Sequence, residues 1–234
     1  MKQGGEDQDN RFYENRMEDP GHEQEPDPED FLDEPERPPG PLATFPSFRH
    51  AIPALTVFFI FYLATVVYMK YPEGDYLWLS GEAFFHRHEY WRVVTALLTH
   101  ADLHHLVSNA LIFLVFGWML KSYFGMHAFP WLSFGTGIVA NILTVSLYSP
   151  EMRLIGASGM AYGMVGLWLI FCIRHDTDHS IPLRIFRAIG FSLIMLIPTT
   201  FEAQVSYLAH GLGFLFGCVL GFLALPCIRL RDPR

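Results

Sequence analysis

Cysteine, an apolar stretch near the N-terminus, and acidic residues within the later apolar stretches are all scarce in this sequence. Met1 is not followed by a basic start and a short apolar core, so we expect no cleavable signal peptide. The lack of an Arg-rich presequence argues against mitochondrial import. Before residue 47, 14 Asp and Glu stand against four Lys and Arg, and aliphatic residues are few. Such a segment buries too little apolar surface to offset its ordering entropy, so we expect residues 1–46 to form an acidic, disordered tail.

From Arg49 onward, apolar runs dominate, each close to the roughly 20 residues that a helix needs to cross the hydrocarbon of a bilayer. Six runs qualify, and the fifth is short and interrupted. The sequence therefore predicts an all-α polytopic membrane protein, with a six-helix membrane domain over residues 47–228 and a short basic tail over 229–234. We expect the spans at 52–69, 104–120, 128–147, 158–173, 188–198 and 205–226.

Basic residues near the span ends predict the orientation. With the N-terminus inside, eight basic residues fall on the cytoplasmic side and four outside, so we expect both tails in the cytoplasm. The cysteines then lie in spans or at their cytoplasmic ends, where a structural disulfide is not expected. The lipid bilayer is the first expected partner, nucleic acid is not one, and we expect a bacterial plasma (inner) membrane. The cysteines are Cys172, Cys218 and Cys227.

Two segments between spans stand out. The outer one, from Lys70 to about Leu103, mixes aromatic and charged residues, which suits a structured loop at the membrane interface. A loop this long is uncommon unless it is functional, although aromatic anchoring alone would explain it equally well. The inner one, Arg174 to Arg187, contains His and Asp but shows no known metal-ligand spacing, so we expect a solvated loop without chemistry.

Ser158 begins one apolar run and His210 lies inside another. Polar groups are costly in hydrocarbon and are functional by default, so a nucleophile and its base are the pair to suspect. Small residues at four-residue spacing let membrane helices approach closely, which predicts that these two helices are neighbours. Glycine stripes and helix-bonded serines are also common for structural reasons, so neither residue alone decides. The small residues are Gly159 and Gly163, then Ala209, Gly213, Gly217 and Gly221.

His105 and Asn109 are four residues apart, so they share a face at the outer end of the second span. Both can present N–H donors to an oxygen that becomes negatively charged during acyl transfer. A zinc site at His100, His104 and His105 is the rival interpretation. The helical zinc-protease motif requires Glu after its first histidine, and Ala101 stands there instead, so we expect no metal.

The ordered set from Trp91 to Gly221 resembles the rhomboid family of intramembrane serine proteases. Each motif is weak alone, but the ordered set is specific. Its parts are Trp91-Arg92, His100, His105, Asn109, Gly156-Ala157-Ser158-Gly159, Tyr162, and Ala209-His210 with Gly213 and Gly217.

The resemblance implies a role for each residue. Ser158 would attack the scissile carbonyl and His210 would be its general base. The Ser158 backbone N–H and the side chains of His105 and Asn109 would form the oxyanion hole, and Tyr162 would orient the base. The remaining residues would support the structure near the site: His100, Trp91, Arg92, Gly156, Gly159, Gly213 and Gly217. The spans hold no well-placed carboxylate, and Glu202 falls in a short outer loop, so the residues themselves favour a dyad over a triad.

The resemblance also implies a six-transmembrane-helix rhomboid-like bundle that cleaves single-span or multi-span membrane proteins through a site opening outward. The fifth span, with Pro198, resembles the mobile lateral gate of that family. No cofactor is implied, and a weak oligomer is left open. One alternative is a catalytically inactive rhomboid-like module that binds membrane proteins. Another is a small transporter with a histidine relay, which would spread polar residues over both leaflets.

Overall fold

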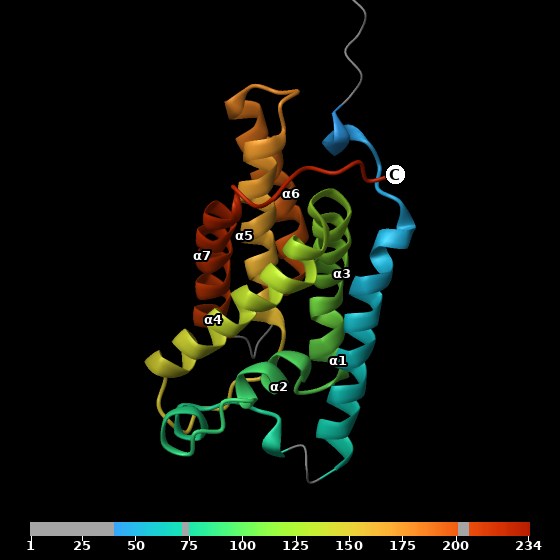
Figure 1. Ribbon diagram of the computed structural model, residues 1–234. Helices are drawn as coiled ribbons and strands as arrows, with labels where there is room; N and C mark the ends of the chain where they lie inside the picture. Colours follow the sequence, from blue (N-terminus) through green and yellow to red (C-terminus); the bar gives the residue numbers. More distant parts are fainter. Residues whose placement is uncertain (1–39, 72–74, 201–205) are drawn as a thin grey trace, which may run out of the picture. The chain divides into compact units, whose positions relative to one another are not determined.

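The computed structural model describes residues 40–71, 75–200 and 206–234. In this part of the chain, six long helices and one short helix account for most residues, and the only β pairing is one antiparallel bridge between Leu79 and Leu154 (Figure 1). The predicted tail over 1–46 lies mainly outside the described residues. The helices are α1 Ile52–Lys70, α2 Arg92–Leu98, α3 Leu103–Met126, α4 Ser133–Leu147, α5 Ser158–His175, α6 Ile181–Thr200 and α7 Tyr207–Ala224.

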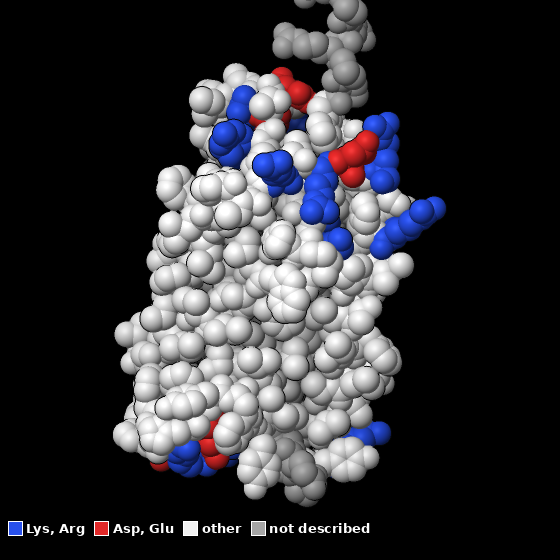
Figure 2. All heavy atoms as spheres, viewed as in Figure 1, with Lys and Arg blue, Asp and Glu red and all other residues white. Residues whose placement is uncertain are grey.

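The chain is an all-α polytopic membrane protein. By length and apolarity alone, three helical stretches of the described residues could each cross a bilayer: Phe48–Lys70, Leu103–Leu147 and Tyr207–Ala224. The second is 45 residues long and contains both α3 and α4. On the face drawn in Figure 2, coloured charges gather at the two ends and leave an uncharged band between them, as a bilayer requires.

The central helix of the bundle is α5. It packs against α3, α4, α6 and α7, and most of its residues are buried (Figure 1). Because neighbouring helices cover it, this helix can carry Gly159, Gly163 and Gly166 without exposing them to lipid. The bundle therefore places this glycine-containing helix where protein surrounds it.

Two predicted spans begin elsewhere in the structure. The third was expected from residue 128, but the regular helix α4 starts at Ser133, after a π-helical turn that contains Pro130. Proline lacks the N–H that a regular helix needs, which accounts for the delay. The fifth was expected from Ala188, but α6 starts at Ile181. Most of the predicted loop Arg174–Arg187 is therefore helical, because α5 also continues to His175.

The predicted structured outer loop is confirmed. Glu82–His86 forms a π-helical turn, α2 follows it, and Leu79 pairs with Leu154 just before α5. A buried amide of Asn141 in α4 donates to the carbonyl oxygen of Val93 in α2 at 3.1 Å. This loop is thus part of the fold and contacts the segment that leads into α5.

The two ends of the described chain meet beside α3. The N–H of Ser47 donates to the carbonyl of Pro233 at 2.9 Å, and the Tyr123 hydroxyl donates to the carbonyl of Thr44 at 2.8 Å. Phe45 and Phe48 pack on the ring of Trp118. Residues 40–46 of the predicted tail therefore make defined contacts with the bundle.

Candidate active site

The helix α5 begins at Ser158, where the sequence places a helix start, and the backbone before it takes a conformation that favours glycine. Gly156 has φ +115°, and its N–H donates to the carbonyl of Ala96 in α2 at 2.9 Å. The N–H of Ala157 donates to Nε2 of His100 at 3.3 Å. Because the first backbone N–H groups of a helix lack partners within it, Ser158 stands at a position suited to a developing negative charge.

Glycines bring α5 and α7 into backbone contact, which confirms that the two helices are neighbours. A Cβ added to Gly213 would overlap the carbonyl oxygen of Gly159, and one added to Gly217 would overlap that of Gly163. On the other side, a Cβ on Gly159 would lie 3.3 Å from the carbonyl oxygen of Ala209. Ser158 directly precedes Gly159 and His210 directly follows Ala209, and these two neighbours touch across the interface.

His210 is buried between aromatic rings. Its imidazole stacks on Tyr162 of α5 with ring centroids 4.1 Å apart and an interplanar angle of 14°. Tyr207 approaches it edge-on at 6.3 Å. Its Nε2 is buried and has no hydrogen-bond partner among the described residues. A buried imidazole nitrogen without a partner is costly in a structural role, so this atom favours a functional one.

His105 and Asn109 lie on α3 as the spacing predicts. A Cβ on Gly156 would lie 2.8 Å from Cε1 of His105, so this imidazole packs against the turn that leads to Ser158. Asn109 is buried, and its amide nitrogen donates to the carbonyl of His105 at 2.9 Å. A side-chain amide has two N–H groups, so one such bond leaves a donor in reserve.

His100 connects three elements at the same end of the bundle. Its backbone N–H donates to the hydroxyl of Thr65 in α1 at 3.1 Å, and its ring centroid lies 5.1 Å from that of His105. Burial, with a further effect from His105, lowers the pKa of His100 to about 3. The imidazole is therefore neutral at neutral pH, as it must be for Nε2 to accept from Ala157.

Arg92 and Trp91 differ sharply. The Arg92 guanidinium is buried, pairs with Glu89 at 2.6 Å and donates to the carbonyl oxygens of Asp75 and Trp78. The residue Trp91 is 55% exposed, and its backbone carbonyl accepts from the N–H groups of Val94 and Thr95 in α2. The Arg92 side chain thus holds the loop together, and the supporting role of Trp91 stays a prediction.

The described residues contain no group of three His, Cys, Asp or Glu side chains that could hold a metal ion. His100, His104 and His105 are adjacent in sequence, but His100 is directed to Ala157 and packs on His105. The groups that the described site presents are a serine hydroxyl, imidazoles and N–H donors.

A comparison with protein families places this constellation. The Rhomboid domain model matches residues 87–227, which is more than half of the chain and includes every candidate residue from Trp91 to Gly217. The chain belongs to the rhomboid family. Its α1 precedes the matched region, and its outer loop is matched from residue 87 onward.

Relatives of this rhomboid protein occur in bacteria and in eukaryotes. The Bacillus subtilis protein YdcA is 27% identical over 150 residues, covering 62% of this chain and 71% of its own. Mouse rhomboid-related protein 2 is 28% identical over 163 residues, covering 63% of this chain and 53% of its own. Rhomboid-like protease 3 of Toxoplasma gondii is 35% identical over 98 residues, covering 41% and 37%. The chain thus spans about half or less of the two eukaryotic relatives.

The rhomboid site contains supporting residues that the sequence reasoning missed. Asp102 caps α3 by accepting from the N–H of His105 at 2.7 Å, and an Asp before an apolar run is a recognisable cap signal. Tyr148 forms a 2.6 Å hydrogen bond with Ser206, the cap of α7. No sequence signal points to that pair, since the two residues are far apart in the chain.

Proposed function

We propose that this rhomboid protein is an intramembrane serine endopeptidase that hydrolyses peptide bonds in or near transmembrane helices of other membrane proteins. The observation that carries the proposal is the state of His210. Its buried Nε2 has no partner among the described residues, and its ring is held by Tyr162 of the helix that begins at Ser158. An imidazole held in this way is suited to act as a general base, because its buried nitrogen can accept a proton.

In the proposed reaction, the Ser158 hydroxyl oxygen attacks the scissile carbonyl while its proton passes to Nε2 of His210. A serine hydroxyl is a weak nucleophile unless such a base is adjacent, and that hydrogen bond often tightens only when substrate binds. His210 then protonates the leaving amine. Water attacks the resulting ester, with His210 again taking and returning the proton, which frees Ser158.

The negative oxygen of the tetrahedral intermediate would be stabilised by N–H donors. We assign this role to the Ser158 backbone N–H and to the side chains of His105 and Asn109. Support comes from the position of Ser158 at the first residue of α5 and from the packing of His105 against Gly156. No carboxylate is assigned as a third member, and Glu202 lies outside the described residues.

We further propose that both termini lie in the cytoplasm, so that the site opens to the outer leaflet. The support is the excess of basic residues at the other end of the bundle. The substrates would be single-span or multi-span proteins whose helices unwind near that end, because the hydrogen bonds of an intact helix shield its peptide bonds. We propose the bacterial plasma membrane as the location, and the Bacillus subtilis relative is in keeping with this.

The test is cleavage of a labelled single-span substrate by purified protein in liposomes. Ser158→Ala and His210→Ala should each lower the rate by roughly 10⁴ or more, as loss of a nucleophile or base does elsewhere. Ser146→Ala is the matched serine control, since that hydroxyl donates to the carbonyl of Ile142 in its own helix. His127→Ala, exposed at the end of α3, is the histidine control. A serine-directed fluorophosphonate should label Ser158.

The second candidate is a catalytically inactive rhomboid that binds membrane proteins. Retention of both Ser158 and His210 favours the protease over this module. If wild-type protein binds the substrate but neither cleaves it nor reacts with the fluorophosphonate, the inactive module is correct. Cleavage that persists in both Ala variants would instead refute the dyad.

A further inference from the structure

At the end of the bundle opposite the candidate active site, the start of α6 and the end of α5 enclose a cavity of about 210 Å³. This volume is about seven times the roughly 30 Å³ that a water molecule occupies in the liquid, so the cavity can hold a small polar group. Its wall has an apolar part and a charged part. The apolar part includes Met119, Trp168 and Phe191, and the charged part consists of Asp176, Arg184 and Arg187.

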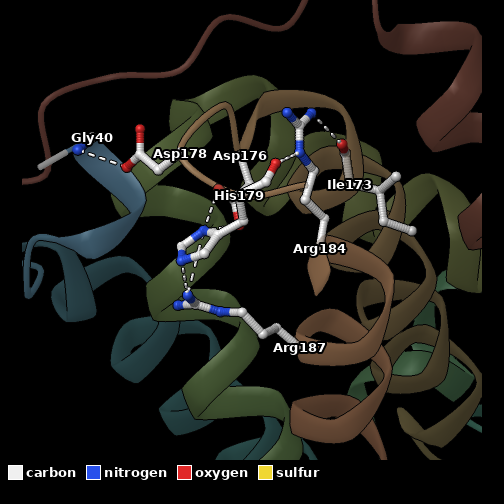
Figure 3. A network of polar contacts seen from close by, with 7 residues as sticks. All are labelled: Gly40, Ile173, Asp176, Asp178, His179, Arg184 and Arg187. Carbon is white, nitrogen blue, oxygen red and sulfur yellow. Dashed lines mark hydrogen bonds and ion pairs between the residues drawn. The ribbon is translucent and has the colours of Figure 1, made fainter. Parts of the chain in front are cut away.

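The charged wall is organised around His179 in the α5–α6 loop (Figure 3). Nδ1 of His179 pairs with the carboxylate of Asp176 at 2.8 Å, and Nε of Arg184 donates to the carbonyl of His179 at 2.6 Å. The guanidinium of Arg187 contacts the His179 ring. Each guanidinium has five N–H donors, so these bonds leave further donors for a ligand on the same wall.

The cavity lies where a lipid headgroup would lie. The sequence predicts that α5 and α6 both cross the membrane. Since α5 ends at His175 and α6 begins at Ile181, we expect the loop between them to lie at the edge of the hydrocarbon. Lys and Arg side chains gather at this end of the face drawn in Figure 2. Basic pockets between membrane helices are suited to phosphate-bearing headgroups, and the apolar part of this wall is suited to the glycerol and acyl carbons of the same lipid.

We propose that this cavity binds the headgroup of phosphatidylethanolamine from the surrounding leaflet. The phosphodiester lies on the guanidinium groups of Arg184 and Arg187, and the ammonium group lies on the carboxylate of Asp176. The glycerol and the first methylenes pack on Phe191 and Met119. The inference does not depend on the proposed protease activity.

The carboxylate decides between headgroups. Phosphatidylglycerol also carries a phosphodiester, but its uncharged glycerol would add no cation beside the carboxylate that Asp176 already shares with His179, and that carboxylate would then face the phosphate oxygens, where like charges at short range repel. Phosphatidylethanolamine offers a cation to the carboxylate and an anion to the two guanidiniums. The arrangement of two positive groups and one negative group on one wall therefore fits a zwitterionic headgroup best.

The test uses the full-length protein in phosphatidylcholine nanodiscs that contain either phosphatidylethanolamine or phosphatidylglycerol. Native mass spectrometry of the released protein then counts the retained lipids. We expect wild type to retain phosphatidylethanolamine preferentially and Arg187→Gln to reduce this by about tenfold, the usual effect of a charge-assisted hydrogen bond. Asp176→Asn should shift the preference toward phosphatidylglycerol. Arg174→Gln, an exposed arginine at the end of α5 outside the cavity, is the matched control.

Three results would overturn the proposal. The first is equal retention in wild type and Arg187→Gln, with Arg187→Lys as a milder variant if the Gln form proves unstable. The second is an unchanged lipid preference in Asp176→Asn, which removes the case for ethanolamine. The third is displacement of the lipid by excess inorganic phosphate, which would make the cavity a simple anion site.

Discussion

The helices α6 and α7 contact the same central helix in different ways. The helix α7 lies backbone to backbone on α5, so closely that a Cβ on Gly166 would come 2.5 Å from the carbonyl oxygen of Phe214. The helix α6 meets its neighbours through side chains, with the Phe191 ring 6.0 Å from that of Trp168 and 5.5 Å from that of Phe116. One interface is set by the main chain and the other by rotatable groups.

This difference implies that α7 is held rigidly on α5, whereas α6 can shift. Backbone contacts leave α7 little freedom to slide, so His210 keeps its place relative to the helix of Ser158. Side-chain contacts can repack when a helix shifts, and such repacking accompanies the small sliding motions of packed helices. We therefore expect the candidate dyad to sit on the rigid pair, and any gate to be formed by α6.

The largest expected effect comes from breaking the tight interface. Gly213→Ala places a Cβ against the carbonyl oxygen of Gly159, which cannot move aside as a flexible side chain can. We expect a loss of about 3 kcal/mol in the free energy of unfolding, the upper range for overpacking. The measurement is denaturant unfolding in detergent micelles.

Gly211→Ala is the control for that variant, because a Cβ at this position of the same helix meets nothing within 4 Å. Equal stability of the two variants would show that α7 is less tightly held than its glycines suggest.

The second prediction concerns the pH dependence of stability at His100, which accepts a hydrogen bond from the turn that leads into α5. The folded-state pKa of His100 is about 3, so below pH 6.5 the unfolded chain binds a proton that the folded protein does not. Stability from this group is complete above pH 6.5 and falls by about 1.4 kcal/mol per pH unit below it. At pH 7, His100→Asn should be less stable because the Nε2 acceptor of the Ala157 N–H is lost. Toward pH 4 its stability should decline less steeply than that of the wild type, because the variant lacks the titrating imidazole. Parallel stability profiles for the two proteins would contradict this account.

The sequence predicts the rigid pair better than the rest. The start of α5 at Ser158 and the contact of its glycines with those of α7 follow from local spacing, because small residues four apart form a stripe on any helix. The paired His105 and Asn109 follow from the same periodicity. These features require no knowledge of distant contacts.

The start of α6 is the feature that the sequence predicts worst. Arg184 and Arg187 suggest a solvated loop, yet both lie in the first turns of the helix. Long basic side chains can keep their charge at the membrane edge while their stems cover apolar surface, so charge alone does not end a span. The contact between Tyr148 and Ser206 is likewise unpredictable, since it joins residues 58 positions apart.

That contact provides the third test. Tyr148 bonds at 2.6 Å to Ser206, whose hydroxyl and carbonyl accept from the N–H groups of Ala209 and His210. Tyr148→Phe should cost about 1 kcal/mol of stability, the usual value for one hydrogen bond. It should also change the pH profile of substrate cleavage, because the cap lies one turn before the proposed base.

Two comparisons check this positioning role. Tyr62→Phe, an exposed tyrosine on α1, is the matched control and should alter neither property. In a double-mutant cycle, Tyr148→Phe should have no added effect once Ser206→Ala is present. Additive losses would mean that Tyr148 acts through some other contact.

The smallest effect tests the looser side of the comparison. A Cβ on Gly190 of α6 meets nothing within 4 Å, in contrast to Gly213 of α7. Alanine stabilises a helix interior relative to glycine, so Gly190→Ala should raise the free energy of unfolding by about 0.5 kcal/mol rather than lower it. Unfolding in the same micelles as Gly213→Ala gives the direct contrast. If Gly190→Ala is also strongly destabilising, α6 is held as closely as α7, and side-chain packing would no longer explain how one helix could move while the other keeps His210 in place.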